Sequence, residues 1–421
     1  MKSMNFKFLA VFLVLASFLY GCLKTDEATP IDENGAILSA ESAQRIKTPI
    51  SDEGKIITYS SQAIPNQYIV VFKENALDNR EAEAIGYEAR QNFMKTEVQA
   101  ILAADRIPAE RVQHVYGHAI KGFAATLTTE EVAILSKSDK VAYIEQDQVM
   151  SINMGGPGGG GGGGGSTSQV TPYGITRVNG GVSGAAGTGW IIDSGIDLDH
   201  PDLNVDVARS MSFLSGGGGN TSADDYNGHG THVAGTVAAI DNSQGVIGVA
   251  AGASVVAVRV LDRRGSGSTS GVIAGVNYVA ANAANGDAAN MSLGGGVSSA
   301  LDNAVLAASS ACPFALAAGN ESSPANNSSP ARVNGNNIYT VSSMTSSNSW
   351  SSFSNYGNPP VDYCAPGSSV YSTYKDGGYA TLSGTSMATP HVCGILLLGN
   401  ISTDGVVSGD PDGTPDPIAV H

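Results

Sequence analysis

An unbroken run of eight glycines, residues 158–165, interrupts this chain of 421 residues. Glycine contributes no side chain to a core and loses much backbone entropy when it is ordered, so such a run behaves as a tether. Composition changes across it, because Lys375 is the only lysine after the run. The sequence therefore predicts two folded parts, an N-terminal domain at 65–154 and a C-terminal domain at 169–400, joined by a linker at 155–168.

Charge and composition argue against two broad classes of protein, nucleic-acid-binding proteins and wholly disordered ones. The chain carries 22 basic and 38 acidic residues, a net charge of −16, which repels a phosphate backbone and disfavours nucleic-acid binding. Hydrophobic residues make up 42% and charged residues 14%, which is enough apolar surface for sizeable cores and excludes wholesale disorder.

Residues 1–21 are typical of a secretory signal peptide, with two lysines ahead of an apolar stretch that is too short to span a bilayer. The stretch ends in Leu-Tyr-Gly-Cys, which resembles the lipobox of bacterial lipoproteins, although Tyr20 departs from the usual small residue. We expect export with a lipid on Cys22 and a polar spacer over 22–64. The alternative is ordinary signal cleavage with an incidental cysteine.

Three further cysteines, Cys312, Cys364 and Cys393, lie in apolar surroundings. At most one disulfide can form among them. Small buried cysteines usually serve as packing residues, so we assign them no catalytic role.

The sequence of the N-terminal domain predicts a small α+β sandwich of ferredoxin-like type. Thr128 and Glu131 stand at capping-box spacing before a helix. The expected order is strand, long helix, strand, helix, strand, with residues 68–72, 122–127 and 141–144 as strands and 78–104 as the long helix.

The C-terminal domain alternates short apolar strands with helical stretches, which predicts an α/β fold with a parallel sheet flanked by helices. Expected strands are 190–192, 255–261, 289–293, 314–318 and 338–342. Expected helices are 229–240, 269–284, 299–309 and 386–398. The acidic residues 401–421 predict a solvated tail, with weak calcium binding by its aspartates as the alternative.

Three segments carry residue types that suit nucleophilic catalysis. Asp193 follows an apolar strand, His229 opens His-Gly-Thr-His-Val-Ala-Gly, and Ser386 lies in Gly-Thr-Ser-Met-Ala-Thr-Pro-His. Each alone is equally compatible with a helix cap or a structural role. Together they supply a nucleophile, a general base and an orienting carboxylate, which a weakly nucleophilic hydroxyl needs.

Unrelated folds that use Asp, His and Ser for catalysis carry them in different orders along the chain. The order here, Asp, His, Ser, is the subtilisin order. Residues 174–399 resemble subtilisin-type serine proteases of the proteinase K branch. The segments Asn-Met-Ser-Leu-Gly-Gly at 290–295, Ala-Ala-Gly-Asn at 317–320 and Ser-Ser-Phe-Ser-Asn-Tyr-Gly at 351–357 agree with this family. The resemblance implies a subtilisin-like fold and a serine endopeptidase.

The resemblance also implies individual roles. Asp193 orients His229, His229 takes the proton of Ser386, and Asn320 donates to the oxyanion together with the backbone N–H of Ser386. No cofactor is needed for this chemistry. Relatives often bind structural calcium, but where proteinase K relatives have an aspartate this sequence has Thr345, so that site is doubtful.

In the family an extended peptide pairs between two exposed edges. The primary pocket is walled by backbone, and the matched positions, which include Pro330 and Ala331, carry no charge. We therefore expect broad specificity with a preference for apolar or aromatic residues. The residues expected to bind substrate are Gly265, Ser266, Gly267, Ser292, Leu293, Gly294, Ala317, Ala318 and Gly319.

The N-terminal domain resembles the inhibitory propeptide of subtilases in Tyr-Ile-Val-Val-Phe-Lys at 68–73, Gly-Phe-Ala-Ala-Thr-Leu at 122–127 and Val-Ala-Tyr-Ile-Glu-Gln at 141–146. The resemblance implies a monomeric zymogen whose propeptide inhibits its own peptidase. It also implies self-cleavage between 150 and 155, which would free the protease from a membrane anchor into the periplasm, to the cell surface or to the medium.

Other functions remain possible at this stage. A catalytically silent subtilase fold could serve as a binding or inhibitor protein. A serine esterase is disfavoured because Ser386 lies in Gly-x-Ser-x-Ala rather than Gly-x-Ser-x-Gly. His229 and His232 lack the glutamate of a zinc-binding His-Glu-x-x-His, so we expect His232 and His391 to be structural.

Overall fold

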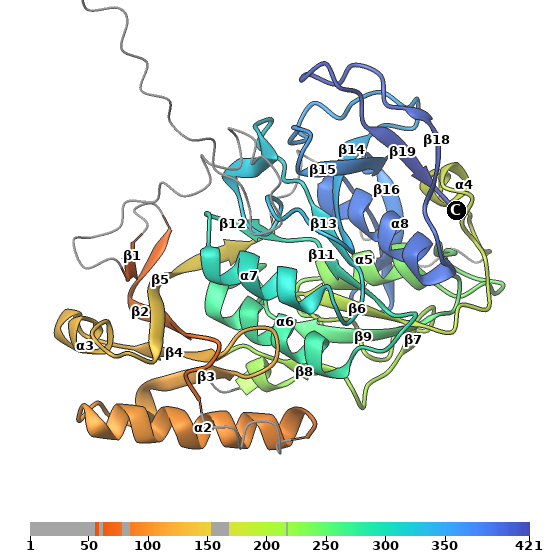
Figure 1. Ribbon diagram of the computed structural model, residues 1–421. Helices are drawn as coiled ribbons and strands as arrows, with labels where there is room; N and C mark the ends of the chain where they lie inside the picture. Colours follow the sequence, from red (N-terminus) through yellow and green to blue (C-terminus); the bar gives the residue numbers. More distant parts are fainter. Residues whose placement is uncertain (1–54, 59–61, 78–84, 153–167, 216–217) are drawn as a thin grey trace, which may run out of the picture. The chain divides into compact units, whose positions relative to one another are not determined.

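The computed structural model describes residues 55–58, 62–77, 85–152, 168–215 and 218–421, all within one compact unit (Figure 1). The expected signal peptide, Cys22, nearly all of the spacer and the glycine run lie outside the described residues. Across the described ranges, no helix combines the length and apolar character needed to cross a bilayer.

The N-terminal domain is an antiparallel sheet with two helices on one face. The strand order is β5-β2-β4-β3, with β1 (Ile56–Ile57) added parallel to β5 at the edge. The other strands are β2 (Ala63–Phe72), β3 (Val112–Tyr116), β4 (Gly122–Thr126) and β5 (Val141–Ser151). The helices are α2 (Tyr87–Ala104) and α3 (Thr129–Leu135). This arrangement confirms the predicted α+β fold.

Successive side chains of β2 point to opposite faces of this sheet, and both faces are buried. Val70 and Phe72 pack with Met94 and Val98 of α2, whereas Ile69 and Val71 belong to the core that continues into the C-terminal domain. The capping box at α3 forms as predicted, with the side chains of Thr128 and Glu131 each accepting from the other residue's N–H. The docked sheet is therefore covered by helices on both sides.

The C-terminal domain is built on a parallel sheet of order β19-β15-β14-β13-β11-β6-β9-β7, with β8 also paired to β9 and β18 antiparallel to β19. The strands are β6 (Thr188–Asp193), β7 (Asn204–Val205), β8 (Met211–Ser212), β9 (Ser254–Arg259), β11 (Ala288–Met291), β13 (Phe314–Ala317), β14 (Ile338–Met344), β15 (Val361–Pro366), β18 (Ser402–Val406) and β19 (Pro417–Val420). The predicted parallel α/β fold is confirmed.

Helices cover both faces of the parallel sheet (Figure 1). One core joins the sheet to α5 and α8 through residues such as Val233 and Val392, and the other joins it to α6 and α7 through Val276 and Leu301. The four helices are α5 (His229–Ala238), α6 (Thr269–Asn282), α7 (Ser299–Ala308) and α8 (Thr385–Leu398). They begin within one residue of their predicted starts.

Residues beyond α8 do not form the solvated tail that the sequence predicted. β19 pairs with β15 through Ile418 and Cys364, and Ile418, Ala419 and Val420 are buried. Asp416 is fully buried and accepts from Ser342 Oγ and Asn358 Nδ2. The prediction overlooked that four residues, Pro-Ile-Ala-Val, are enough to extend a sheet edge.

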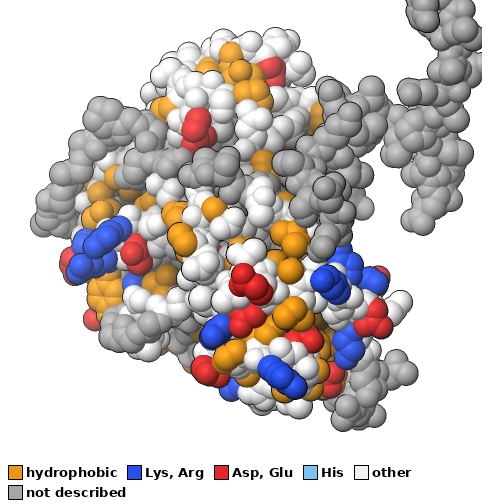
Figure 2. Space-filling view, turned by 90° about the vertical axis from the view of Figure 1, so that its left-hand side faces the viewer, with side chains coloured by type: hydrophobic (Ala, Val, Ile, Leu, Met, Phe, Trp, Pro, Cys, Tyr) orange, Lys and Arg blue, Asp and Glu red, His pale blue; other side chains and the backbone are white. Residues whose placement is uncertain are grey.

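The two domains differ in surface chemistry. Most of the Lys, Arg, Asp and Glu side chains visible in Figure 2 gather in its lower part, at the height of α2 and α3 in Figure 1. The C-terminal domain contributes a single lysine, Lys375.

Candidate active site

The residues predicted to be catalytic lie where strands end and helices begin. Asp193 is the last residue of β6, His229 is the first of α5, and Ser386 is the second of α8. Asn320 follows β13 by three residues. The carboxyl ends of parallel strands open toward one side of a sheet, so this topology places such groups together.

Asp193 and His229 form a buried pair. The Nδ1 of His229 lies 2.8 Å from Oδ1 of Asp193, and neither side chain is more than 1% exposed. Asp193 Oδ1 also accepts from the backbone N–H of Ser194 at 2.7 Å, which holds the carboxylate in place. Because a carboxylate only accepts hydrogen bonds, the imidazole carries a proton on Nδ1, and its Nε2 can accept one.

A second buried carboxylate, Asp225, fixes the start of α5 and was missed in the sequence. It accepts from the backbone N–H groups of Gly228 and Thr231 and from the hydroxyls of Ser194 and Thr231. Ser194 in turn accepts from the N–H of Gly230. This network ties the helix that carries His229 to the strand that carries Asp193.

The hydroxyl of Ser386 is buried and points to backbone. Its Oγ donates to the carbonyl oxygen of Ser292 at 3.1 Å. Within the described part of the chain, the Nε2 of His229 has no hydrogen-bond partner. The predicted Ser386–His229 hydrogen bond is therefore not formed in this conformation, and forming it requires the serine hydroxyl to change its partner.

Asn320 is oriented by the residue just before Ser386. Its Oδ1 accepts from the backbone N–H of Thr385 at 2.8 Å and from the Thr385 hydroxyl at 3.1 Å. The same hydroxyl accepts from the N–H of Gly319 at 3.1 Å. These hydrogen bonds hold the amide oxygen of Asn320 against Thr385. The NH₂ group of Asn320 therefore faces away from Thr385.

The backbone just before His229 and just before Asn320 requires glycine. Gly228, just before His229, has φ 106°, and a Cβ there would lie 2.4 Å from the ring of Tyr374. Gly319, just before Asn320, has φ 105°, and a Cβ there would lie 2.3 Å from Nδ2 of Asn355. Any other residue would be strained and would displace the neighbouring ring or amide.

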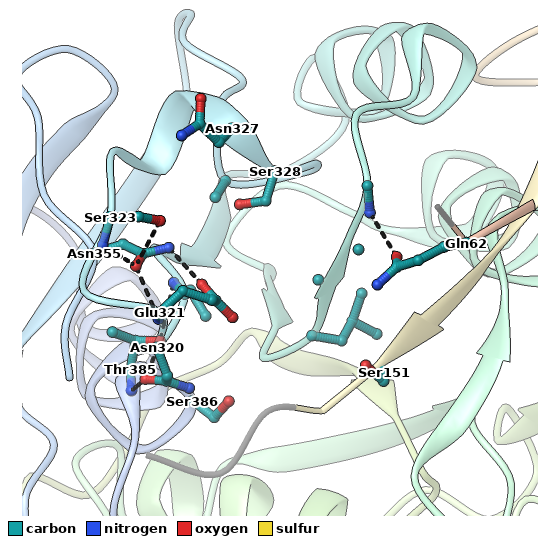
Figure 3. Close-up of a pocket in the computed structure, with 17 residues that line it drawn as sticks. Gln62, Ser151, Asn320, Glu321, Ser323, Asn327, Ser328, Asn355, Thr385 and Ser386 are labelled. Carbon is teal, nitrogen blue, oxygen red and sulfur yellow. Dashed lines mark hydrogen bonds between the residues drawn. The ribbon is translucent and has the colours of Figure 1, made fainter. Parts of the chain in front are cut away.

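A pocket of about 250 Å³ adjoins these residues. In Figure 3, Asn320, Thr385 and Ser386 lie on one side of it, and Ser151 and Gln62 lie across from them. Of the predicted wall residues, Ala317, Gly319 and Ala331 line the pocket with Leu293 and Gly294, whereas Ala318 and Pro330 do not.

Glu321 also lines the pocket and was not predicted. Its Oε2 accepts from Nδ2 of Asn355 at 2.7 Å. The expectation of a charge-free pocket therefore holds for the matched positions but not for the whole wall. The carboxylate directly follows Asn320 in the sequence, which was the available signal.

The two predicted substrate-binding edges carry a strand of the N-terminal domain. They form β10 (Ser266–Ser268) and β12 (Gly294–Gly295), and both pair antiparallel with the end of β5. Beyond β10, the carbonyl of Gly265 accepts from the N–H of Ile152 at 3.1 Å. The last residues of β5 thus occupy the position predicted for a substrate strand.

The two other histidines of the motifs are structural. Nε2 of His232 lies 3.0 Å from the carbonyl of Val370, and burial lowers the pKa of His232 to about 3. Nδ1 of His391 lies 2.9 Å from the carbonyl of Met387, and burial lowers the pKa of His391 to about 4. Both are therefore neutral packing residues.

The described residues contain no group of three or more His, Cys, Asp or Glu side chains that could hold a metal ion. At Thr345 the hydroxyl lies 3.0 Å from that of Ser347, a neutral pair without the carboxylates that calcium prefers. Calcium does not fit this position.

Comparisons with known proteins agree with this geometry. Residues 190–399 match the model of the subtilase family, and residues 67–153 match that of the peptidase inhibitor I9. The chain is 39% identical over 343 residues to the "Extracellular serine proteinase" of Thermus sp. (strain Rt41A), covering 80% of each chain. The chain belongs to the subtilase family of serine proteases.

Other subtilases are similar over most of this subtilase's length. The "Alkaline serine exoprotease A" of Vibrio alginolyticus is 40% identical over 342 residues, which are 80% of this chain and 60% of that relative. The "Alkaline serine protease ver112" of Corniculantispora psalliotae is 36% identical over 394 residues, 86% of this chain and 91% of the relative.

A solved structure, that of a cold adapted subtilisin-like serine proteinase, is also similar to this subtilase. It has 42% sequence identity and a TM-score of 0.51, covering 58% of this chain and 96% of that one.

Proposed function

We propose that this subtilase is made as a zymogen and hydrolyses peptide bonds through Ser386, His229 and Asp193. The observation that carries the proposal is the buried 2.8 Å contact between His229 and Asp193, together with a pocket whose wall holds Ser386 and Asn320. A carboxylate on Nδ1 keeps Nε2 available as a general base, which is the state that a serine nucleophile requires.

The proposed reaction assigns one role to each of these groups. His229 takes the proton of Ser386 as its oxygen attacks the peptide carbonyl, and Asp193 stabilises the resulting imidazolium. Asn320 and the backbone N–H of Ser386, at the N-terminus of α8, stabilise the oxyanion. His229 then protonates the leaving amine, and water hydrolyses the acyl-enzyme.

The N-terminal domain would inhibit this activity until it is released. β5 occupies both substrate edges, so a protein substrate cannot pair with β10 or β12 while the domain is docked. Inhibition by an occupied substrate strand needs no chemical modification of the site. It ends when the domain is cut and dissociates.

A direct test compares wild type with Ser386→Ala. Wild type should separate its two domains and hydrolyse azocasein, and a serine-reactive inhibitor should abolish both reactions. Ser386→Ala should stay joined and inactive. A wild-type chain that folds but never cleaves azocasein would favour the alternative, a silent subtilase fold used for binding or inhibition.

We also propose broad specificity with an apolar or aromatic preference beside the cut bond. Leu293, Ala317 and Ala331 provide apolar contacts in the pocket. Hydrogen bonds to the main chain of a substrate do not discriminate between its side chains. The carboxylate of Glu321 on the same wall disfavours acidic residues by like-charge repulsion. Strict cleavage after Lys or Arg in peptide profiling would contradict this preference.

Export and lipidation are further parts of the proposal. They rest on residues 1–22 of the sequence, which lie outside the described residues, and on a relative named as extracellular. The uncut precursor, trapped as Ser386→Ala, should fractionate with membranes, and Cys22→Ser should release it. Equal membrane association of both chains would contradict a lipid on Cys22.

We propose that the released protease acts as a monomer and that its chemistry needs no cofactor. The reacting groups named above are all side chains and backbone of one chain. Activity that survives a chelator and elution at the mass of one peptidase domain would support this. Reversible loss of activity in the chelator would contradict it.

A further inference from the structure

The main chain of Ser386 lacks its regular helical partner. In an α-helix each carbonyl accepts from the N–H four residues further on. The residue four places after Ser386 in α8 is Pro390, which has no N–H. Ser386 is only 4% exposed, so its carbonyl needs a donor from elsewhere in the protein. The hydroxyl of Ser292 supplies that donor, at 2.9 Å.

Asn290 sets the direction of this hydroxyl. Its Nδ2 donates to Ser292 Oγ at 2.8 Å, so the hydroxyl accepts from the amide and keeps its single proton for the carbonyl of Ser386. The reverse orientation of the amide would draw the hydroxyl proton to the amide oxygen and deprive the carbonyl of Ser386 of this donor. The observed orientation therefore connects Asn290 to Ser386 through one hydroxyl.

The position of Asn290 in the sheet is one where an apolar side chain ordinarily stands. It is the third residue of β11, opposite Ile191 of β6 and Ala315 of β13, and it is fully buried. Strands buried on both faces of a parallel sheet are mostly apolar. Among the described residues, Oδ1 of Asn290 finds no hydrogen-bond partner, which costs stability. Packing alone therefore does not explain an asparagine here, whereas the bond to Ser292 does.

Ser292 holds Ser386 at two points. It binds the carbonyl of Ser386 through its hydroxyl, and it binds Oγ of Ser386 through its own carbonyl at 3.1 Å. Rotation about the Cα–Cβ bond of Ser386 moves only Oγ, so the bond to the Ser386 carbonyl does not depend on it. The main chain of Ser386 can thus stay fixed while its hydroxyl exchanges the carbonyl of Ser292 for His229.

We propose that Asn290 is a positioning residue for the nucleophile. Through the hydroxyl of Ser292 it holds the carbonyl of Ser386, and so sets the direction of the hydroxyl and of the N–H of that residue. This inference rests on the proposed role of Ser386 and adds two side chains that act through it. Both the attack and the stabilisation of the oxyanion depend on this support, because the N–H of Ser386 is one of the proposed oxyanion donors.

The test measures kcat and KM of the processed protease on a peptide substrate. Ser292→Ala removes the donor and keeps the backbone, so kcat should fall about 10-fold to 100-fold, the cost of a misplaced reacting group, with KM little changed. Asn290→Leu, of similar shape, leaves the hydroxyl without its orienting donor and should lower kcat in the same way but less. Ser342→Ala is the matched control, because it also removes a fully buried serine hydroxyl, one that donates to Asp416, and it should keep the wild-type kcat.

A rescue separates this role from a loss of packing. Pro390→Ala returns an N–H to the position that faces the carbonyl of Ser386, so the carbonyl regains a donor from within α8. The loss of kcat on Ser292→Ala should then be at least about threefold smaller in a chain that also carries Pro390→Ala. A structural role of Ser292 elsewhere in the fold would not respond to the proline.

Wild-type kcat in Ser292→Ala or in Asn290→Leu, a loss confined to KM, or an equal loss with and without Pro390→Ala would overturn the inference and leave the proposed function intact. If thermal unfolding of the uncut chain shows that Asn290→Leu does not fold, the cycle of Ser292→Ala and Pro390→Ala decides alone. A wild-type protein that does not hydrolyse azocasein would refute the proposed function, and this inference with it.

Discussion

At the scale of single residues, Asn320 offers the sharpest test of transition-state stabilisation. Its oxygen is held by two bonds from Thr385, which presets the direction of its NH₂. Asn320→Ala should lower kcat about 100-fold to 1000-fold, the loss typical of one oxyanion donor, and change KM little. Asn327→Ala, another amide on the pocket wall, is the matched control and should behave as wild type. A loss confined to KM would contradict the role.

Asp225 is predicted to position His229 without touching substrate. Asp225→Asn replaces an acceptor oxygen by an NH₂ that faces backbone and hydroxyl donors, so stability should fall by about 1–3 kcal/mol. The start of α5 should loosen, and kcat should fall more than KM rises. Asp224→Asn, at the neighbouring half-buried carboxylate, should have little effect. Equal kinetics in the two variants would show that the network is dispensable.

The candidate reactive residues could be selected from the sequence because motif and chain order mark them. Asp193, His229 and Ser386 each stand at a strand end or helix start, which sequence patterns indicate. Asp225 was missed because nothing local distinguishes a buried acceptor from a solvated carboxylate, and Glu321 was missed because its position after Asn320 does not by itself place the carboxylate on the pocket wall. Their roles depend on what the fold brings against them.

At the scale of elements, two helices of the C-terminal domain begin against carboxylates of β5. Glu145 Oε2 accepts from the N–H of Ala300 in the first turn of α7, and Asp147 accepts from the N–H and hydroxyl of Ser270 in α6. Burial raises the pKa of Glu145 from its ordinary 4.5 to about 7, with Asp302 and Asp147 adding repulsion.

This shift predicts a pH dependence of zymogen stability. The folded chain keeps Glu145 protonated to a higher pH than the unfolded chain, so folding is favoured below pH 4.5, and this contribution is lost as the pH rises to about 7. The loss amounts to about 3 kcal/mol.

Thermal unfolding of Ser386→Ala and of Ser386→Ala with Glu145→Gln should therefore diverge between pH 4.5 and 7, the Glu145→Gln chain becoming the relatively more stable. A difference that does not change with pH would contradict the assignment.

Elements with a clear apolar period were predictable, and short ones were not. The helices that begin at His229, Thr269 and Ser299 matched their predictions, and so did the buried strands β6 and β13. β3 was missed because Gln113 and His114 break its apolar run. The seven residues of β5 beyond Ile144 were missed, and the last three of them, 149–151, pair with strands of the other domain, which local sequence does not report.

At the scale of the whole molecule, the C-terminal residues complete the sheet. Deleting 401–421 would expose the edge of β15 and remove the buried side chains of Ile418 and Val420. Each such side chain is worth about 1.5–3 kcal/mol, so the truncated zymogen should unfold at a clearly lower temperature. Asp412→Asn, in the exposed turn of the same segment, should leave the unfolding temperature unchanged. An unchanged melting temperature on truncation would contradict a structural role for β19.

The central claim is that His229 activates Ser386, although the serine hydroxyl here contacts Ser292 instead. Covalent labelling of the processed protease with a fluorophosphonate, followed by peptide mass mapping, tests it most directly. The account predicts one adduct, on Ser386, and almost none in an already processed protease whose His229 has been blocked by a histidine-alkylating peptide chloromethyl ketone. Labelling of a different serine, or undiminished labelling of Ser386 after His229 is blocked, would contradict it.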